Sequence, residues 1–416
     1  MAASALEDPQ RARLPLARLL FLMGGVYTVQ STVGAMMFQG VPTVLRSSGA
    51  ALDMIGLVSL FMVPWALKFL WSPFVEGWRI PVTGPRRSRV IIVTGQVIIA
   101  ALLVVLALHG IEQGFGVLFI GFGVIALIAA TVDIAGDGFM IEQLKPEHRG
   151  WGNVIQVGGG YAGIMIGTGL FLVLVDRFGW LIATAAMAGI ACFLTAPFLT
   201  ARDISSSDGA EERPRPSLRN AFARSDIRWG LLTILLSQIG LRMITVMTGP
   251  FLIDNGLSAS TIGILTGTIG TALCIVFIVL SGLAIRRWTA RRTLSGMLVL
   301  QILSFGLFTL FALAPQQDTL LSGLFLVQSA IIAGSFVALY TVIMDWTSAH
   351  QAGTDFTIFQ CTDALVSVFA GFGSGIIAEH FGYGICFGIA TGFAASALVL
   401  LPVILRRTDK AQSHAG

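Results

Sequence analysis

Twelve long apolar segments, separated by short polar gaps, account for most of this 416-residue chain. Hydrophobic residues make up 55% of the positions and charged residues only 12%, which is too few charges to cover the surface of a water-soluble domain. A helix needs roughly 20 apolar residues to cross the hydrocarbon core of a bilayer, and the segments have about that length. The sequence therefore predicts an all-α membrane protein with twelve transmembrane helices.

The predicted spans form two groups of six. The first group is 16–41, 54–75, 90–109, 114–137, 153–175 and 180–199, and the second is 229–251, 260–285, 293–313, 320–345, 356–377 and 385–405. The longest polar stretch, 200–228, lies between the groups and carries prolines and mixed charges, as a linker does. We expect an N-terminal six-helix bundle over 1–199, a cytoplasmic linker over 200–228 and a C-terminal six-helix bundle over 229–416.

The basic residues predict the orientation, because cytoplasmic loops collect Lys and Arg. With the N-terminus placed in the cytoplasm, 22 of the 26 basic residues fall in inner segments and only Arg46 and Arg177 in outer loops. Lys68 and Arg242 fall within spans. We expect both termini in the cytoplasm of a bacterial cell, with the chain in the inner membrane. The net charge of +4 then reflects topology and predicts no nucleic-acid partner.

The two halves of the chain share short motifs at equivalent places. The segment 176–180 reads Asp-Arg-Phe-Gly-Trp and the segment 379–383 reads Glu-His-Phe-Gly-Tyr, each between the last two spans of its half. Leu45, Gly49, Ile55 and Gly56 match Leu252, Gly256, Ile262 and Gly263. Two parallel six-helix repeats are the layout of major facilitator transporters, which hold substrate between the halves near mid-membrane.

Longer motifs sharpen this resemblance. The segments 64–76 (PWALKFLWSPFVE) and 131–138 (TVDIAGDG) resemble the muropeptide-permease and acetyl-CoA-transporter branch of the major facilitator superfamily. The segments 344–346 (MDW) and 352–360 (AGTDFTIFQ) look most like the RhtX/FptX-like siderophore importers of that superfamily. Glu76 is a departure, because many major facilitator proteins place Asp there. The resemblance implies a transporter rather than an enzyme, with a small-molecule substrate, no cofactor, and function as a monomer.

Polar side chains within the spans are the candidates for substrate binding. Arg242 lies near the middle of its span, where a charge is costly unless it faces protein or water. Arg242 either anchors an anionic group of the substrate or pairs with a carboxylate that packs helices together. Neutral polar groups either bind a polar ligand or join helices to one another. They are Tyr27, Gln30, Gln156, Tyr161, Gln328, Tyr340 and Gln360.

Acidic and basic groups near the inner ends of the spans are the candidates for proton coupling and gating. Asp133 and Asp137 are four residues apart and share a helix face, and Lys68 is their potential partner. These three either form a proton-responsive cluster, with Asp133 as the coupling residue, or have separate structural roles. In the second case Asp133 pairs locally, Lys68 extends to the cytoplasmic interface and Asp137 is hydrated at the helix end. Glu76 is a candidate for an inner-gate charge pattern. Asp345, Asp355 and Asp363 are expected to cluster near the inner gate and to lock charges there.

The leading functional interpretation is a proton-driven inner-membrane importer of a siderophore or its iron complex, and the siderophore class comes from the resemblance. The alternatives are a muropeptide permease or an exporter of small amphipathic compounds, and, in another class, a membrane-embedded substrate sensor. No nucleophile, metal-ligand set or cofactor loop stands out in the sequence, and the five histidines are scattered. We therefore expect no protein-bound metal.

Overall fold

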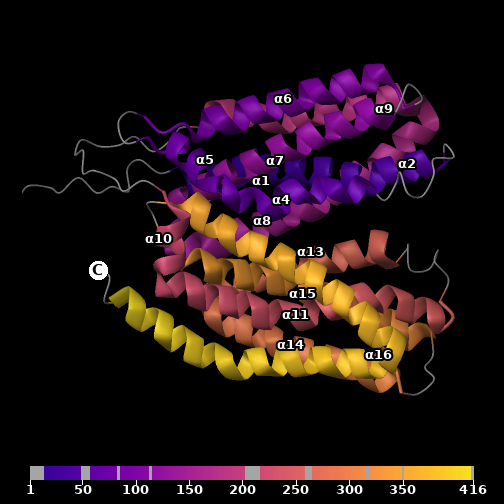
Figure 1. Cartoon of the computed structure of the whole chain (residues 1–416), viewed down its shortest axis with the longest axis vertical. Helices are drawn as coiled ribbons and strands as arrows, with labels where there is room; N and C mark the ends of the chain where they lie inside the picture. The colour runs from indigo at the N-terminus through magenta and orange to yellow at the C-terminus, as the bar shows by residue number, and fades with distance from the viewer. Residues whose placement is uncertain are drawn as a thin grey trace, which may run out of the picture.

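The computed structural model describes residues 14–47, 57–81, 85–111, 115–201, 216–257, 265–313, 318–348 and 351–413. Within these ranges all regular structure is helical. Figure 1 shows the helices of the first half of the chain lying together and those of the second half packed beside them, with the helix axes roughly parallel. The prediction of an all-α fold built from apolar helices is confirmed.

The helices of the first half cover all six predicted spans of that half. They are α1 (Leu16–Ala35), η2 (Met36–Gly40), α2 (Val41–Ser47), η3 (Leu57–Met62), α4 (Val63–Leu67), η4 (Lys68–Leu70), α5 (Ser72–Arg79), α6 (Ser88–His109), α7 (Phe115–Gln143), η5 (Pro146–His148), α8 (Arg149–Ile164), η6 (Met165–Leu170), α9 (Phe171–Thr195) and η7 (Ala196–Thr200).

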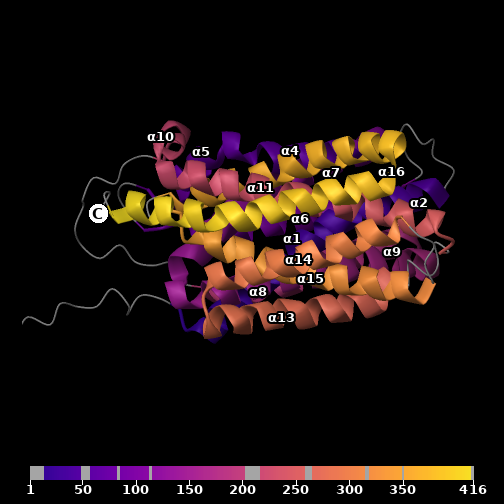
Figure 2. The ribbon, with the colours of Figure 1, turned by 90° about the horizontal axis from the view of Figure 1, so that it is seen from below.

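The second half repeats this pattern after a short linker helix. Its elements are α10 (Leu218–Ala223), α11 (Ser225–Asp254), η8 (Leu265–Gly270), α13 (Thr271–Arg287), α14 (Ala290–Phe311), α15 (Asp318–Met344) and α16 (Ala352–Ser413). Figures 1 and 2 both place α10 at the end of the molecule that carries the C-terminus. Leu14 lies at that end as well, because its backbone N–H donates to Gln143 near the end of α7. We call this the termini end.

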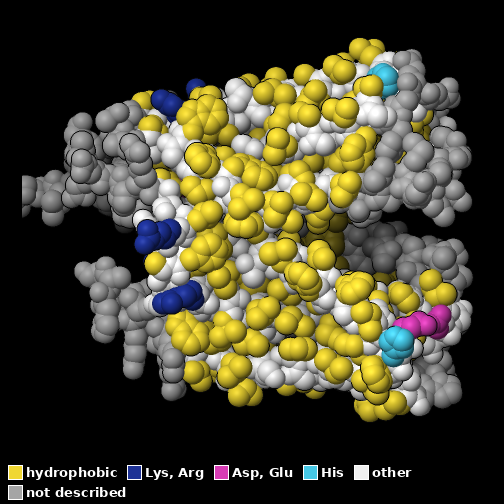
Figure 3. Space-filling model, in the orientation of Figure 1, with side chains coloured by type: hydrophobic (Ala, Val, Ile, Leu, Met, Phe, Trp, Pro, Cys, Tyr) yellow, Lys and Arg dark blue, Asp and Glu magenta, His cyan; other side chains and the backbone are white. Residues whose placement is uncertain are grey.

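Eight helices in the described ranges are long and apolar enough to cross a membrane. Two of them, Pro146–Thr200 and Ala352–Leu405, each contain two predicted spans. Gly179 and Gly382 divide them with φ angles of 77° and 81°, which side chains other than glycine rarely adopt. Figure 3 shows an outer surface dominated by apolar side chains, with the visible Lys and Arg side chains near the termini end. Such a surface suits lipid rather than water.

The second predicted span is not one continuous α-helix. Residues 57–79 alternate between 3₁₀ and α segments, and Lys68 begins the short 3₁₀ turn η4. Pro64 and Pro73 each remove a backbone donor, which favours such interruptions. The break matters because Lys68, which lies in it, is buried.

Close packing joins α1 to the helix that follows η5. The backbone of Gly163 lies against Ser31 and that of Gly167 against Thr32, so closely that a methyl group at either glycine would collide with backbone atoms. The glycine-rich sequence of this helix predicts such close contact, because small residues let helix backbones approach.

Candidate functional site: a polar cavity between the two halves

A cavity of about 440 Å³ lies between the halves of the chain. Helices from both halves line it, and charged, amide, hydroxyl and aromatic side chains all contribute. The lining residues are Tyr27, Gln30, Ser31, Gly34, Phe38, Met62, Trp65, Ala66, Lys68, Asp133, Gln156, Arg242, Tyr340, Gln360, Asp363, Ala364, Ser367 and Val368.

An ion pair between Lys68 and Asp133 dominates the wall from the first half. Lys68 is 2% exposed, and the interruption at η4 lets its side chain reach α7. Gln30 on α1 braces the same helix, because its amide can donate to the Ala129 carbonyl at 3.2 Å and accept from the Asp133 backbone N–H at 3.1 Å. A buried cation of this kind is stable only because a carboxylate compensates its charge.

A second ion pair, between Arg242 and Asp363, lies in the wall from the second half. Arg242 Nη2 donates to Asp363 Oδ2 at 2.6 Å, and the Tyr340 hydroxyl donates to the same oxygen at 3.3 Å. The guanidinium lies 5.0 Å from the centre of the Phe336 ring, within the range of a cation–π contact. Arg242 Nε and Asp363 Oδ1 are buried without a hydrogen-bond partner, so each retains capacity for another polar group.

Two contacts connect the halves at the floor of the cavity. Lys68 Nζ donates to Gln360 Oε1 at 2.5 Å. The Cys361 thiol donates to the Trp65 carbonyl, with 3.4 Å between sulfur and oxygen. The floor is therefore built from the broken second span on one side and α16 on the other.

Asp137 lies one helical turn beyond Asp133 and does not line the cavity. Its Oδ1 atom accepts hydrogen bonds from the Tyr27 hydroxyl at 2.9 Å and from Gln156 Nε2 at 3.0 Å. Both donors do line the cavity. A ligand in the cavity can therefore contact Tyr27 or Gln156, and each of these side chains is hydrogen-bonded directly to Asp137.

A second polar region closes the termini end, and Glu76 is its centre. Arg79 donates to both carboxylate oxygens of Glu76, at 2.9 and 2.8 Å, and also binds Glu142 at 2.8 Å. Burial disfavours the charged guanidinium, but the charges of Glu76 and Glu142 outweigh that effect and hold the pKa of Arg79 above its ordinary value. Glu76 Oε1 also accepts the backbone N–H of Gly353 from the second half at 3.2 Å.

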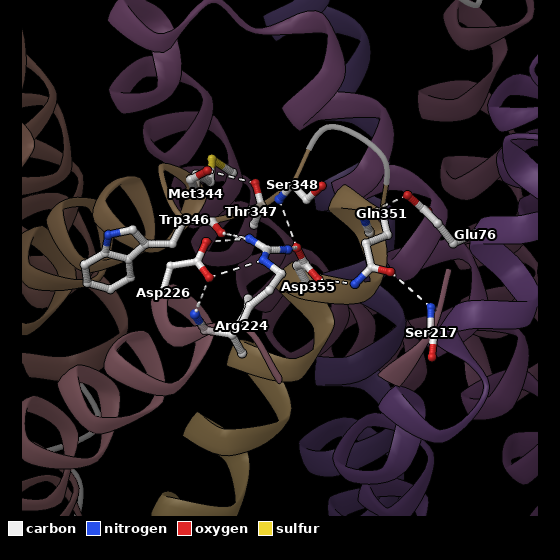
Figure 4. Close-up of polar contacts among 12 residues, drawn as sticks. Glu76, Ser217, Arg224, Asp226, Met344, Trp346, Thr347, Ser348, Gln351 and Asp355 are labelled. Carbon is white, nitrogen blue, oxygen red and sulfur yellow. Dashed lines mark hydrogen bonds and ion pairs between the residues drawn. The ribbon is translucent and has the colours of Figure 1, made fainter. Parts of the chain in front are cut away.

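The turn between α15 and α16 is held from several directions, as Figure 4 shows for ten labelled residues. Arg149 from the first half binds Asp345 at 2.5 Å. Arg224, which follows the linker helix α10, binds Asp226, Asp355 and the Trp346 carbonyl. Burial lowers the pKa of Arg224. The carboxylates of Asp226 and Asp355 have the larger opposite effect, so the pKa lies above its ordinary value. The backbone N–H of Ser217 donates to Gln351 at 3.0 Å.

The expected cluster of Asp345, Asp355 and Asp363 is not present. Each carboxylate has its own arginine, namely Arg149, Arg224 and Arg242 in that order. The reason is distance along the chain, because Asp363 lies eight positions after Asp355 on one helix and a helix rises about 1.5 Å per residue. Asp345 and Asp355 belong to the closed end, whereas Asp363 belongs to the cavity.

Two predicted substrate-binding residues do not line the cavity. Tyr161 packs against an apolar cluster that joins Val154 of the first half to Cys274 and Ile278 of the second half. Gln328 is buried on α15, with its Oε1 atom unpartnered. Their residue types suit a binding site, but they lie on other faces of their helices. The remaining predicted binding residues, Tyr27, Gln30, Gln156, Arg242, Tyr340 and Gln360, all line the cavity.

Sequence reasoning missed several lining residues, although a signal for them exists. On α1 and the η2 segment that continues it, Ser31, Gly34 and Phe38 follow Tyr27 at helical spacings of four, seven and eleven residues. On α16, Ala364 and Ser367 follow Gln360 in the same way. Extending the helical face around each polar candidate would have found them. Within the described ranges, no group of three or more His, Cys, Asp or Glu is placed to hold a metal ion.

This arrangement of apolar helices around a polar cavity, closed at one end by ion pairs, defines a polytopic membrane transporter. The chain belongs to the Major Facilitator Superfamily, whose pattern matches residues 19–314 and 230–416. It is 26% identical over 366 residues to the anhydromuropeptide permease of Escherichia coli K12, covering 86% of this chain and 73% of that protein. A putative transporter of Rickettsia conorii, AmpG 4, is 23% identical over 56% of this chain and 59% of its own length.

Solved structures of the same fold support the assignment of architecture. The transporter FucP in its outward conformation superposes with a TM-score of 0.70 at 14% identity, covering 95% of this chain and 98% of FucP. A bacterial homologue of the iron transporter ferroportin, in an outward-facing state, gives 0.64 at 16% identity, covering 95% of this chain and all of that one. At these identities the likeness concerns the fold alone.

Proposed function

We propose that this chain is a proton-coupled importer of anhydromuropeptide-like solutes, that is, sugars carrying a short peptide. The muropeptide alternative from the sequence therefore replaces siderophore import as the main interpretation, because the named bacterial relatives over most of the chain point that way. The observation that carries the proposal is the composition of the cavity. It places two cations with their carboxylate partners, amides and aromatic rings around one space.

Each part of such a solute has a complementary group in the cavity. The apolar faces of sugar rings pack well on aromatic rings, and Trp65 and Tyr27 offer them. Sugar hydroxyls and peptide amides suit Gln156 and Gln360. A peptide carboxylate suits the planar guanidinium of Arg242. The volume of about 440 Å³ falls in the range of ~300–1,000 Å³ typical of small-molecule sites.

The shape of the molecule supports alternating access. Glu76 and Arg149 join the two halves at the termini end, whereas Figure 3 shows a hollow between the halves on the side away from the C-terminus. With cytoplasmic termini, as the basic residues predict, this conformation faces outward and is ready to load substrate. We propose that the two halves, 1–199 and 229–416, rock about the cavity.

An uptake assay tests this function. The chain is expressed in bacteria that lack their own muropeptide permease, and the cells receive radiolabelled anhydromuropeptide or, separately, radiolabelled ferric siderophore. We expect accumulation of the muropeptide that a protonophore abolishes, and no accumulation of the siderophore. Siderophore accumulation without muropeptide uptake would reverse the assignment, and expression-dependent efflux of preloaded muropeptide would indicate an exporter.

A further inference from the structure

Five charged side chains lie in or beside the cavity, and their charges do not balance. Each cation has a carboxylate partner: Lys68 pairs with Asp133 and Arg242 pairs with Asp363. The fifth group, Asp137, forms no ion pair within the part of the chain that the structure describes. With all five ionised, the group therefore carries one net negative charge.

Asp137 is fully buried, and neutral or already paired groups surround it. From α1 it meets Tyr27, and from α8 it meets Gln156. On its own helix, Asp133 lies one turn away and is occupied by Lys68 of η4. Asp137 Oδ2 has no hydrogen-bond partner.

The other charged and titratable groups nearby are also engaged. Arg79 lies against the next residue of the helix, Gly138, and is held by Glu76 and Glu142. On α16 and α15, Cys361 bonds the Trp65 carbonyl and Tyr340 bonds Asp363. A buried carboxylate without a cation is costly, and binding one proton removes that cost.

We infer that Asp137 holds the transported proton, whereas Asp133 is the fixed counter-charge of Lys68. This inference rests on the proposed proton coupling and revises the expectation that Asp133 is the coupling residue. It fixes the stoichiometry of the site at one proton, because a single proton on Asp137 makes the five-residue group neutral.

The hydrogen bonds of Asp137 also supply a route from substrate to proton. Tyr27 and Gln156 line the cavity and donate to the Asp137 carboxylate. A substrate group that takes either donor removes a hydrogen bond from the ionised form, which favours the protonated form. Substrate and proton therefore assist each other's binding, and this reciprocity is what a symporter requires.

Infrared spectroscopy of the purified, substrate-free protein tests the site directly. A protonated carboxylic acid has a carbonyl stretch that shifts in D₂O and disappears as the acid ionises. We expect the wild-type spectrum to contain one such pH-dependent band from Asp137, beside the bands of the other carboxylic acids. It should be absent in Asp137→Asn and retained in the Lys68→Gln/Asp133→Asn double variant, which removes one ion pair without changing the net charge. Retention of this band in Asp137→Asn, or its loss in the double variant, would overturn the inference.

A second variant keeps the test decisive if Asp137→Asn does not fold. Tyr27→Phe removes one donor to the carboxylate, so the band should titrate about one pH unit higher than in the wild type. An unchanged midpoint would also refute the assignment. Neither measurement uses a substrate. Failure to transport anhydromuropeptide would therefore reject the proposed function. The infrared spectra would still decide whether Asp137 holds the proton.

Discussion

The backbone N–H of Gly353 donates a 3.2 Å hydrogen bond to Glu76 Oε1, and so joins residues 277 positions apart in the chain. Arg79 fixes the Glu76 carboxylate from the opposite side, so that the acceptor is already oriented. The first half of the chain thus presents a rigid acceptor to the start of α16. Arg149 and Asp345 make the neighbouring contact between the halves.

Weakening this closure should shift the protein toward the state that is open at the termini end. The Arg149–Asp345 pair is partly exposed, and such pairs contribute up to about 1 kcal/mol, which corresponds to a roughly fivefold change in population. Arg149→Asp should therefore raise the alkylation rate of Cys361, which is buried at the cavity floor, several-fold. The rate is measured in protein whose other three cysteines are replaced.

The charge-swapped double variant Arg149→Asp/Asp345→Arg is the control, because it restores an attractive pair with both charges exchanged. Its alkylation rate should return toward that of the parent protein. Equal rates in all three proteins would show that this ion pair does not hold the gate.

Arg242 should bind an anionic group of the substrate. Losing one partner of a charge-assisted hydrogen bond typically costs about 1.5–3 kcal/mol, so Arg242→Gln should weaken muropeptide affinity by more than tenfold. Arg242→Lys should recover only part of the loss, because the planar donor fork is absent. Affinity is measured by calorimetry on monodisperse protein. A purely structural arginine would instead lower the yield of folded protein and leave the affinity unchanged.

The glycines that face α1 should be far less tolerant of substitution than their neighbours. Gly167→Ala places a methyl group against the Thr32 backbone and should destabilise the protein by about 1–3 kcal/mol. Gly169→Ala is the matched control, because that site is open and its effect should stay within about 0.5 kcal/mol. Thermal unfolding in detergent compares them, and equal melting temperatures would contradict the close helix contact.

Both termini should be cytoplasmic. Cysteines introduced at Ser4 and Ser413, in a background without native cysteines, should react with an impermeant maleimide only after the cells are permeabilised. The expectation follows from the 22 basic residues assigned to inner segments. Rapid labelling of either position in intact spheroplasts would invert the topology.

The helix positions could be predicted from the sequence because apolar length alone defines a span, and each predicted span contains helix in the structure. The break at Lys68 was not predicted, although Pro64 and Pro73 signal it. Hydropathy also gives no account of which face of a helix meets which neighbour. For that reason the candidates chosen by residue type include Tyr27 and Gln156, which line the cavity, and also Tyr161, five residues from Gln156, which does not.

Partnerships between distant residues were the least predictable part of the site. Nothing in the spacing of Lys68 and Gln360, or of Arg242 and Asp363, indicates that each pair meets across helices. Both pairs depend on the packing of the completed bundle. Asp133 and Asp137, in contrast, share a helix, so their proximity follows from helical periodicity.

The near-contact of two helix backbones at Gly163 and Gly167 determines what can change when the transporter turns over. No layer of side chains separates α1 from α8 there, so neither helix can rotate or slide without backbone collision. We therefore expect the backbones of Tyr27 and Gln156, one on each helix, to keep their separation when the transporter changes state. In the absence of substrate, we expect Asp137 to keep this pair of donors whichever side of the membrane the cavity faces. Under the proposed function, the donor pair beside Asp137 would therefore move as one unit when the two halves rock about the cavity.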